Sequence, residues 1–489
     1  MAAEDDYKCK QRYTRVPTSL DLSDSTTEKN DKTKDNKKEE KSWTWSGMLF
    51  KLFWLCDMLF KLILLWEGCR LWAYYMPAAS EYRPFVNSFE ISVPDIMSSD
   101  TTWMKLGPPL FDPDAPEKYD SFGLHRALSG DGSIVAISES YDDVGGNILF
   151  GKGEGQVWLY GWNGSKYQLT GSIIAAAMEI NFGTAVKLSK DGTTLVVGSY
   201  TFLGGRVQVF DRVTTQKNDG TTWVRRGHAV VGPGFGWEVS LSADGNTIAT
   251  AAVDGVHVFS WTGTKWKALG RTIPGLGPHV DLDLSGDGLT LAARGGDIIF
   301  PGHPVVYQYI RKQWMPKGVE DGRFDHVWAV MISLNHDGSI MAVGGTTNPE
   351  ERFTKPFLDV FQYTGDEDGW VSIHQAKFHH NDTAVRIPHS VALSDNGKVL
   401  SVGTSGTASA DDGKIPRSGG SVHIYVDKED SWEEIFSFDG SPELRTSLFL
   451  VDISSDGNIV LGGYLDRTNA DESKHGTGFV SVYGTHTIQ

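Results

Sequence analysis

LSADGNTIATA, at residues 241–251, contains the pattern that decides the fold of this chain. On both sides of Asp244-Gly245, apolar or small residues recur at every second position, as a half-buried strand requires. An Asp-Gly pair supplies the positive φ angles of a tight turn between antiparallel strands, and Ser242 can hydrogen-bond the turn backbone. The stretch therefore predicts a β-hairpin.

The same phrase returns six more times along the chain, at intervals of 43 to 60 residues. A phrase that recurs at such intervals is typical of a repeat protein. The other six turns are centred on Asp131, Asp191, Asp287, Asp337, Asn396 and Asp456.

Two more strands are expected after each hairpin. The third strand ends on an aromatic residue, as in VWLY at Val157–Tyr160, and the fourth opens on one, as in WKALG at Trp266–Gly270. Four antiparallel strands make one blade of a β-propeller. The sequence therefore predicts an all-β fold, a seven-bladed β-propeller of four-stranded blades over residues 101–489.

The last unit lacks its fourth strand. The chain ends at Gln489, six residues after Tyr483, whereas Trp103–Gly107 is a fourth-strand phrase with no hairpin before it. We therefore expect the N-terminal strand to complete the last blade and close the ring. Closure removes exposed sheet edges and joins the two ends of the domain.

The first three units begin with Phe-Gly, and in this respect residues 101–489 resemble the FG-GAP type of β-propeller repeat, to which integrin-like propellers belong. The pairs are Phe122-Gly123, Phe182-Gly183 and Phe235-Gly236. The resemblance implies an extracellular or lumenal interaction domain that binds without catalysis. The later four units lack Phe-Gly and no calcium-binding loop is found, so calcium is not carried over from the family.

A mostly apolar stretch, Met48–Trp66, precedes the propeller and is long enough to cross a bilayer. Tryptophans flank it, as they do at membrane interfaces. Lys51, Asp57 and Lys61 oppose insertion, which leaves an amphipathic helix lying in the interface as the alternative. We expect a single transmembrane helix with its flank at residues 44–76.

The segments around this helix predict its orientation. Residues 1–43 have the composition of a disordered tail, and lysines cluster next to the apolar stretch, so the N-terminus is expected to stay cytoplasmic. Residues 77–100 would then be a linker to a propeller in the extracellular or lumenal space. Asn163 and Asn381 lie in Asn-x-Ser/Thr tripeptides and are candidate N-glycosylation sites in that compartment.

The charge of the chain excludes one class of partner. The net charge is −17, and no basic stripe suited to phosphates is found, so no nucleic-acid partner is expected. The expected partners are the membrane and a protein or glycan. No cofactor is predicted, because no dinucleotide, P-loop or zinc-protease motif is found.

Candidate chemistry is confined to two groups of residues. His379, His380, Asp382 and His389 could supply metal ligands, but their spacing fits no standard zinc pattern and also suits an exposed loop, so no metal site is predicted. Asp281 and Asp283 alternate onto one face of a strand. They could line the central channel and hold a cation or act as acid and base, or they could be solvated carboxylates.

Two functions follow from these observations. The first is a membrane-anchored β-propeller that binds a protein or glycan without catalysis, and no catalytic residues are assigned. The alternative is a hydrolase or lyase with its site in the central channel, because propellers host unrelated chemistries.

Overall fold

The computed structural model describes residues 103–113, 122–140, 155–174, 181–201, 204–215, 220–277, 280–296, 301–318, 328–346, 356–365, 367–375, 387–405, 420–428, 431–439, 446–466 and 478–485. The predicted tail, transmembrane helix and linker, residues 1–100, lie outside these ranges. The described part contains no helix that is both long and apolar enough to cross a membrane.

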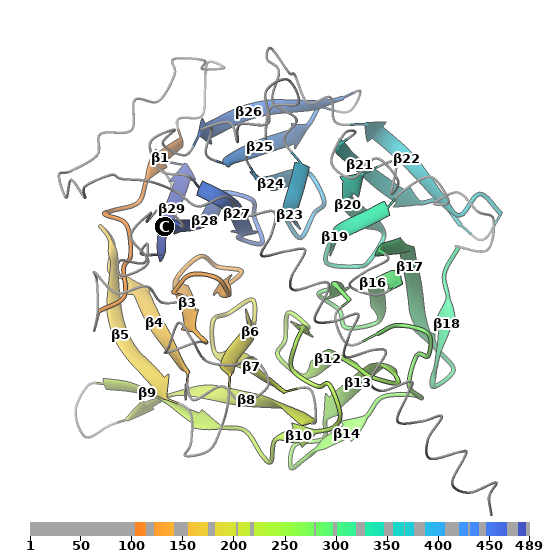
Figure 1. Ribbon diagram of the computed structural model, residues 1–489, viewed down its shortest axis with the longest axis horizontal. Coiled ribbons are helices and arrows are strands. Elements are labelled where there is room, and N and C mark those ends of the chain that lie inside the picture. The colour runs from red at the N-terminus through yellow and green to blue at the C-terminus, as the bar shows by residue number, and fades with distance from the viewer. Residues whose placement is uncertain are drawn as a thin grey trace, which may run out of the picture. The chain divides into compact units, whose positions relative to one another are not determined.

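The described residues form an all-β propeller of seven sheets set around a common centre (Figure 1). The first three blades are β2 (Arg126–Leu128), β3 (Ile134–Glu139), β4 (Gln156–Trp162) and β5 (Tyr167–Ile174); β6 (Phe182–Leu188), β7 (Thr194–Thr201), β8 (Gly204–Thr215), β9 (Gly220–Arg225) and β10 (Val230–Val231); and β11 (Val239–Leu241), β12 (Thr247–Ala252), β13 (Gly255–Trp261) and β14 (Trp266–Ala268).

The next three blades follow the same antiparallel order from the centre outward. They are β15 (Leu282–Leu284), β16 (Thr290–Gly296), β17 (Pro301–Ile310) and β18 (Gln313–Pro316); β19 (Trp328–Leu334), β20 (Ile340–Thr346), β21 (Pro356–Tyr363) and β22 (Trp370–Gln375); and β23 (Ile387–Leu393), β24 (Val399–Ser405), β25 (Ser421–Asp427) and β26 (Trp432–Asp439).

The seventh blade confirms the predicted closure. It contains β27 (Thr446–Ile453), β28 (Ile459–Asp466) and β29 (Gly478–Thr485), and its outer strand is β1 (Trp103–Lys105) from the other end of the domain. Trp103 is opposite Thr485 and Lys105 is opposite Tyr483. The two ends of the propeller therefore share one sheet (Figure 1).

One blade differs from the predicted four strands. In the second blade the long strand β8 pairs with β9 along one part and with β10 along another. The extra strand is only two residues, Val230–Val231, opposite Val207 and Arg206. So short a pairing has no periodicity that the sequence could reveal.

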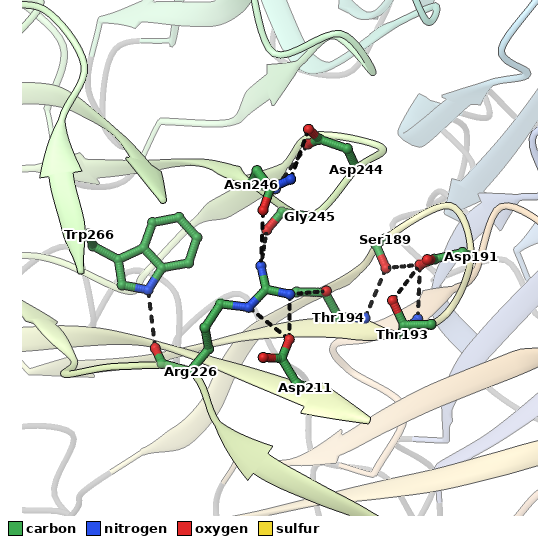
Figure 2. Close-up of polar contacts among 10 residues, drawn as sticks. All are labelled: Ser189, Asp191, Thr193, Thr194, Asp211, Arg226, Asp244, Gly245, Asn246 and Trp266. Carbon is green, nitrogen blue, oxygen red and sulfur yellow. Dashed lines mark hydrogen bonds and ion pairs between the residues drawn. The ribbon is translucent and has the colours of Figure 1, made fainter. Parts of the chain in front are cut away.

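The seven hairpin turns follow the prediction at their glycines, whereas the Asp or Asn before each glycine does not have a positive φ. The glycine of every turn has a positive φ, between 64° and 77°. In the second blade the hydroxyl of Ser189 donates to Asp191 (2.7 Å) and accepts the N–H of Thr194 (2.9 Å), as Figure 2 shows. Asp191 also accepts the N–H of Thr193. The Ser-x-Asp-Gly phrase is thus a turn that holds its own strands in register.

The Phe-Gly pairs are sites of close packing between blades. Gly123, Gly183 and Gly236 all have positive φ, at 83°, 93° and 84°. A Cβ on Gly183 would lie 2.9 Å from Cβ of Ser138 in the preceding blade, and one on Gly236 would lie 2.6 Å from the backbone nitrogen of Ser199. Only glycine satisfies both the backbone angle and the space.

The hydrophobic core lies between the blades. Each of seven clusters among the described residues draws its side chains from two adjacent blades, with β1 included in the cluster between the sixth and seventh. Phe182 and Leu195, for example, pack against Leu159 of the first blade, and all three are fully buried. Each blade is therefore stabilised by its neighbours.

An arginine strengthens the contact between the second and third blades (Figure 2). Arg226 Nε donates to Asp211 Oδ1 (2.7 Å) in its own blade, and Nη1 donates to the carbonyl of Gly245 (2.8 Å) in the turn of the next. In return, the indole N–H of Trp266 donates to the carbonyl of Arg226 (3.3 Å). The guanidinium thus links a fourth strand to the neighbouring turn.

Candidate functional site at the propeller axis

The seven hairpin turns join into a closed ring at one end of the propeller, here called the turn face. Each turn donates a backbone N–H to a carbonyl of an adjacent turn, over 2.8 to 3.0 Å. The donors and acceptors are Ser455 to Gly130, Asp131 to Lys190, Lys190 to Ala243, Ala243 to Gly286, Asp287 to His336, His336 to Asp395, and Asp395 to Ser455. The innermost turns therefore converge closely on the axis.

An ion pair crosses this ring. Lys190 Nζ in the second blade lies 2.6 Å from Asp395 Oδ2 in the sixth, although these blades are not neighbours. His336 of the fifth blade lies 3.6 Å from the same oxygen. Both members of the pair are partly exposed, so the pair contributes little stability, but it shows how near the turns approach one another.

Five charged side chains interact near the axis, on the innermost strands or on the residue just before them. We call them the axial cluster: Lys187, Glu238, Asp281, Asp283 and Asp452. Lys187 on β6, Asp283 on β15 and Asp452 on β27 each lie two residues before the serine of their hairpin turn. Glu238 and Asp281 each lie four residues before the serine of theirs. Alternation along a strand puts these positions on one face, so blades far apart in sequence present charge to one place.

The carboxylates Asp281 and Asp283 join the fourth blade to the fifth. Asp281 Oδ2 accepts the backbone N–H of Ile332 (2.6 Å), and Asp283 Oδ2 accepts that of Leu334 (2.8 Å). Asp283 Oδ1 also accepts the hydroxyl of Ser240 (3.1 Å) from the third blade. Both side chains are half-buried and bonded to neighbouring blades rather than freely solvated.

The same contact recurs around the axis with other side chains. Asp452 Oδ2 accepts the N–H of Leu128, which joins the last blade to the first (2.8 Å). Serines do the same elsewhere: Ser240 accepts Leu284 N–H (3.0 Å), Ser333 accepts Leu393 N–H (3.1 Å), and Ser390 accepts Val451 N–H (3.0 Å). A polar side chain on an innermost strand thus serves as a link to the next blade.

Lys187 is the positive centre of the axial cluster. Burial alone would lower the pKa of its ammonium, but Asp452, Asp283, Glu238 and Asp281 together raise that pKa above its ordinary value. The lysine therefore stays protonated and offsets part of the negative charge around it.

Four carboxyl groups around one ammonium cannot all ionise at ordinary pH. Burial, then the charges of Asp281 and Asp283, raise the pKa of Glu238 to about 8 although Lys187 opposes the shift. Burial likewise raises the pKa of Asp281 to about 6, against the N–H of Ile332 and the charge of Lys187. The pair of Glu238 and Asp281 therefore keeps a proton to higher pH than ordinary carboxyl groups do, which is how an acid and a base are set apart in a site.

The candidate metal residues are not brought together within the described residues. His379, His380 and Asp382 lie outside them, and His389 lies half-buried on β23, where burial lowers the pKa of its imidazole to about 4. In the part of the chain that the structure describes, no three His, Cys, Asp or Glu side chains are placed to hold a metal ion.

Of the two candidate glycosylation sites, Asn163 is described and exposed. It lies in the turn between β4 and β5, where Oδ1 accepts the backbone N–H of Lys166 (2.9 Å) and of Ser165 (3.0 Å). Because strands alternate in direction, this turn is at the turn face. Asn381 lies outside the described residues.

Comparison with known proteins identifies no family, and the fold rests on the strand order described above. No family model and no curated protein matches the chain, so the FG-GAP likeness rests on the Phe-Gly residues themselves. The chain is similar to the β-propeller domain of Cps50 (Swd1) from Myceliophteria thermophila, at 11% identity over 75% of this chain and 97% of that one, with a TM-score of 0.45.

Two further structures are similar to a comparable degree. The hydrazine synthase of Kuenenia stuttgartiensis is 14% identical over 72% of this chain and 95% of that one, with a TM-score of 0.45. A protein from Lactobacillus plantarum is 14% identical over 69% and 89%, with a TM-score of 0.44. At this distance the chain is a seven-bladed β-propeller with distant structural neighbours.

Proposed function

We propose that this chain is a membrane-anchored β-propeller of FG-GAP type that binds a protein or glycan in the extracellular or lumenal space. Its anchor would be the single apolar helix at Met48–Trp66, with the N-terminus in the cytoplasm. In this function the residues at the axis hold the ring of blades together, and the loops bind the partner.

One observation carries this assignment: the axial carboxylates serve as links between blades. Asp281, Asp283 and Asp452 each accept a backbone N–H of the adjacent blade. A buried N–H left without an acceptor costs about 1–3 kcal/mol, so these carboxylates have a structural reason to be present. The turns also converge at the turn face, whereas the connections between second and third strands, which are long in the first, fifth, sixth and seventh blades, leave from the opposite end.

Glycosylation tests the export that this function requires. The full-length chain, expressed in a cell with a secretory pathway, should carry a glycan on Asn163, because the side chain is exposed. Treatment with an N-glycosidase should then increase the mobility of the chain on a gel. Both Asn163→Gln and Ser165→Ala remove the sequon and should abolish the part of the shift due to this site.

Asn458→Gln serves as the matched control, because Asn458 lies in a turn at the same end of the blades but not in a sequon. A membrane-bound, unglycosylated chain whose propeller is digested by protease added to the cytosolic side of sealed vesicles would contradict the proposal.

A second candidate function, a hydrolase or lyase at the axis, is favoured by one observation. Glu238 has its pKa raised to about 8, in part by the charge of Asp281, so a group that can donate a proton interacts with a group that can accept one. A panel of glycosides and polyuronides incubated with the full chain would reveal turnover. General acid catalysis is worth roughly 10²- to 10⁴-fold, and Glu238→Gln should remove that factor. The absence of turnover on the panel would leave the binding function as the better account.

A further inference from the structure

Three polar side chains in the sixth blade are arranged as a nucleophile, a base and an orienting carboxylate, away from the axial cluster. Ser421 Oγ lies 2.7 Å from His423 Nε2. His423 Nδ1 lies 3.3 Å from Glu434 Oε2. This is the order of groups, and nearly the spacing, by which a serine is activated in acyl transfer.

The backbone explains why the three side chains meet. Ser421 and His423 are two residues apart on β25, so their side chains stand on one face of the sheet. The partner strand β26 has a β-bulge here: Phe436 is opposite Ile424, but Glu434 rather than Ile435 is opposite Tyr425. The extra residue moves Glu434 onto the face of His423, which is how bulges re-aim side chains.

The positions of the protons follow from the carboxylate. Burial alone would raise the pKa of Glu434, but its polar neighbours, His423 first among them, hold that pKa below its ordinary value. The neutral tautomer of His423 that suits an ionised Glu434 has its proton on Nδ1, which lies 3.3 Å from the carboxylate. The other nitrogen, Nε2, is then an acceptor, and the hydroxyl of Ser421 donates to it.

A second hydroxyl supports Ser421. Thr404 Oγ1 on β24 lies 2.7 Å from Ser421 Oγ and accepts the backbone N–H of Ser421 (3.1 Å). Either hydroxyl can donate in this contact, and Thr404 Oγ1 also lies within 3.3 Å of the carbonyl oxygen of Ser421, to which it can donate. Both residues are fully buried, and they lie at the end of β24 and the beginning of β25, where strands open most readily.

Comparison with the equivalent positions of other described strands separates the features that several blades share from those of the sixth blade. The bulge between third and fourth strands also occurs in the first and fifth blades, where the shifted residues are Leu169 and Ser372 instead of a carboxylate. His257 of the third blade matches His423, but Gly255 stands where Ser421 would be. Among the described strands, the sixth blade alone combines the three groups.

We propose that Ser421 is an acyl-accepting nucleophile, with His423 as its base and Glu434 as a positioning residue, in a hydrolase reaction on small carboxylic esters. The serine oxygen bonds to the ester carbonyl carbon while its proton passes to Nε2 of His423. That proton then goes to the departing alcohol as the C–O bond breaks. Water, deprotonated by the same imidazole, releases the acid and restores the serine. This activity is separate from binding by the loops and from chemistry at the axis.

A small fluorophosphonate reagent tests the proposal, because it forms a stable bond to an activated serine oxygen. The full-length chain in detergent should gain one adduct, which peptide mass spectrometry should place on Ser421. Ser421→Ala should abolish it. His423→Gln should slow labelling by about 100-fold or more, since a general base contributes roughly 10²- to 10⁴-fold.

His257→Gln is the matched control: it removes the equivalent imidazole of the third blade and should leave the labelling rate within about two-fold of the unaltered chain. If His423→Gln does not fold, Glu434→Gln takes its place, because the Glu434 side chain is partly exposed and conservative replacement there disturbs packing less. An adduct on another serine, no adduct at all, or one that forms equally fast in the His423 or Glu434 variant would overturn the proposal. Thermal unfolding of each variant separates loss of activation from loss of fold, and glycosylation of Asn163 is read independently.

Discussion

A single side chain at the axis does two things in this propeller. Asp283 holds a backbone N–H of the next blade and also contributes to the field around Lys187. The first role needs only an acceptor, which is why Ser240 and Ser333 fill equivalent positions in other blades. The second role needs a negative charge, and that charge is one of the causes that raise the pKa of Glu238.

Glu238 therefore predicts how stability depends on pH. The folded protein holds this proton up to about pH 8, whereas the unfolded chain releases it near the ordinary value of 4.5. The stability that the proton contributes is complete at low pH and is lost as the pH rises through 8. Burial lowers the pKa of His125 and His389 to about 4, which gives the opposite slope, but only below their ordinary value of 6.5.

Between pH 6.5 and 8, His125 and His389 should hence not contribute to the pH dependence of stability, and the contribution of Glu238 can be measured. We expect the free energy of unfolding to fall by at most about 1.4 kcal/mol per pH unit in this window. Thermal unfolding followed by circular dichroism at each pH measures it. Glu238→Gln should flatten the slope, and an unchanged slope in that variant would show that another group titrates there.

At the scale of elements, the short strand β1 closes the ring of blades. Trp103 is buried and stacks on Phe436 of the sixth blade, with ring centroids 5.8 Å apart. Its strand also covers the edge of β29, which would otherwise be exposed. A three-residue strand thereby contributes both packing between blades and hydrogen bonding within one.

Trp103→Ala should destabilise the whole propeller. Truncation of a buried tryptophan typically costs about 3–5 kcal/mol, because the cavity is only partly filled by its surroundings. Denaturant unfolding followed by tryptophan fluorescence measures the loss. Met104→Ala is the matched control in the same strand: its side chain is 40% exposed, and the change should cost no more than about 0.5 kcal/mol. Equal costs for the two variants would refute the closing role of β1.

The elements show what the sequence could and could not predict. Turns, strand order and the use of Trp103 were predictable because each depends on a local phrase or on a count of strands. The bond from Leu128 to Asp452 joins residues 324 positions apart, and no local pattern indicates it. Ser421 and His423 are visible as neighbours on one strand face, but Glu434 joins them only through a bulge that shifts the register by one residue.

At the scale of the whole molecule, the propeller has what it needs to fold without the preceding segments. Its seven interfaces and its closing strand all lie within residues 103–485, and the three cysteines, Cys9, Cys56 and Cys69, all precede it. No disulfide can therefore contribute to its core.

Residues 101–489, produced alone, should accordingly unfold in one cooperative transition. Differential scanning calorimetry measures this, and the same domain extended to residue 77 is the control. A transition several degrees below that of the extended domain, or a fragment that fails to fold alone, would show that the domain boundary is misplaced.

The shared seventh blade also determines when, during synthesis, the propeller can close. A ribosome releases Trp103 early and Tyr483 last, and at 5–20 residues per second the interval between the two strands is on the order of a minute or less. Until then the first blade lacks the neighbour that covers Phe122 and Ile137, since that neighbour is the last to be made. A nascent chain of this protein must therefore keep an apolar blade face open throughout most of its synthesis, which is the interval in which a chaperone would be needed.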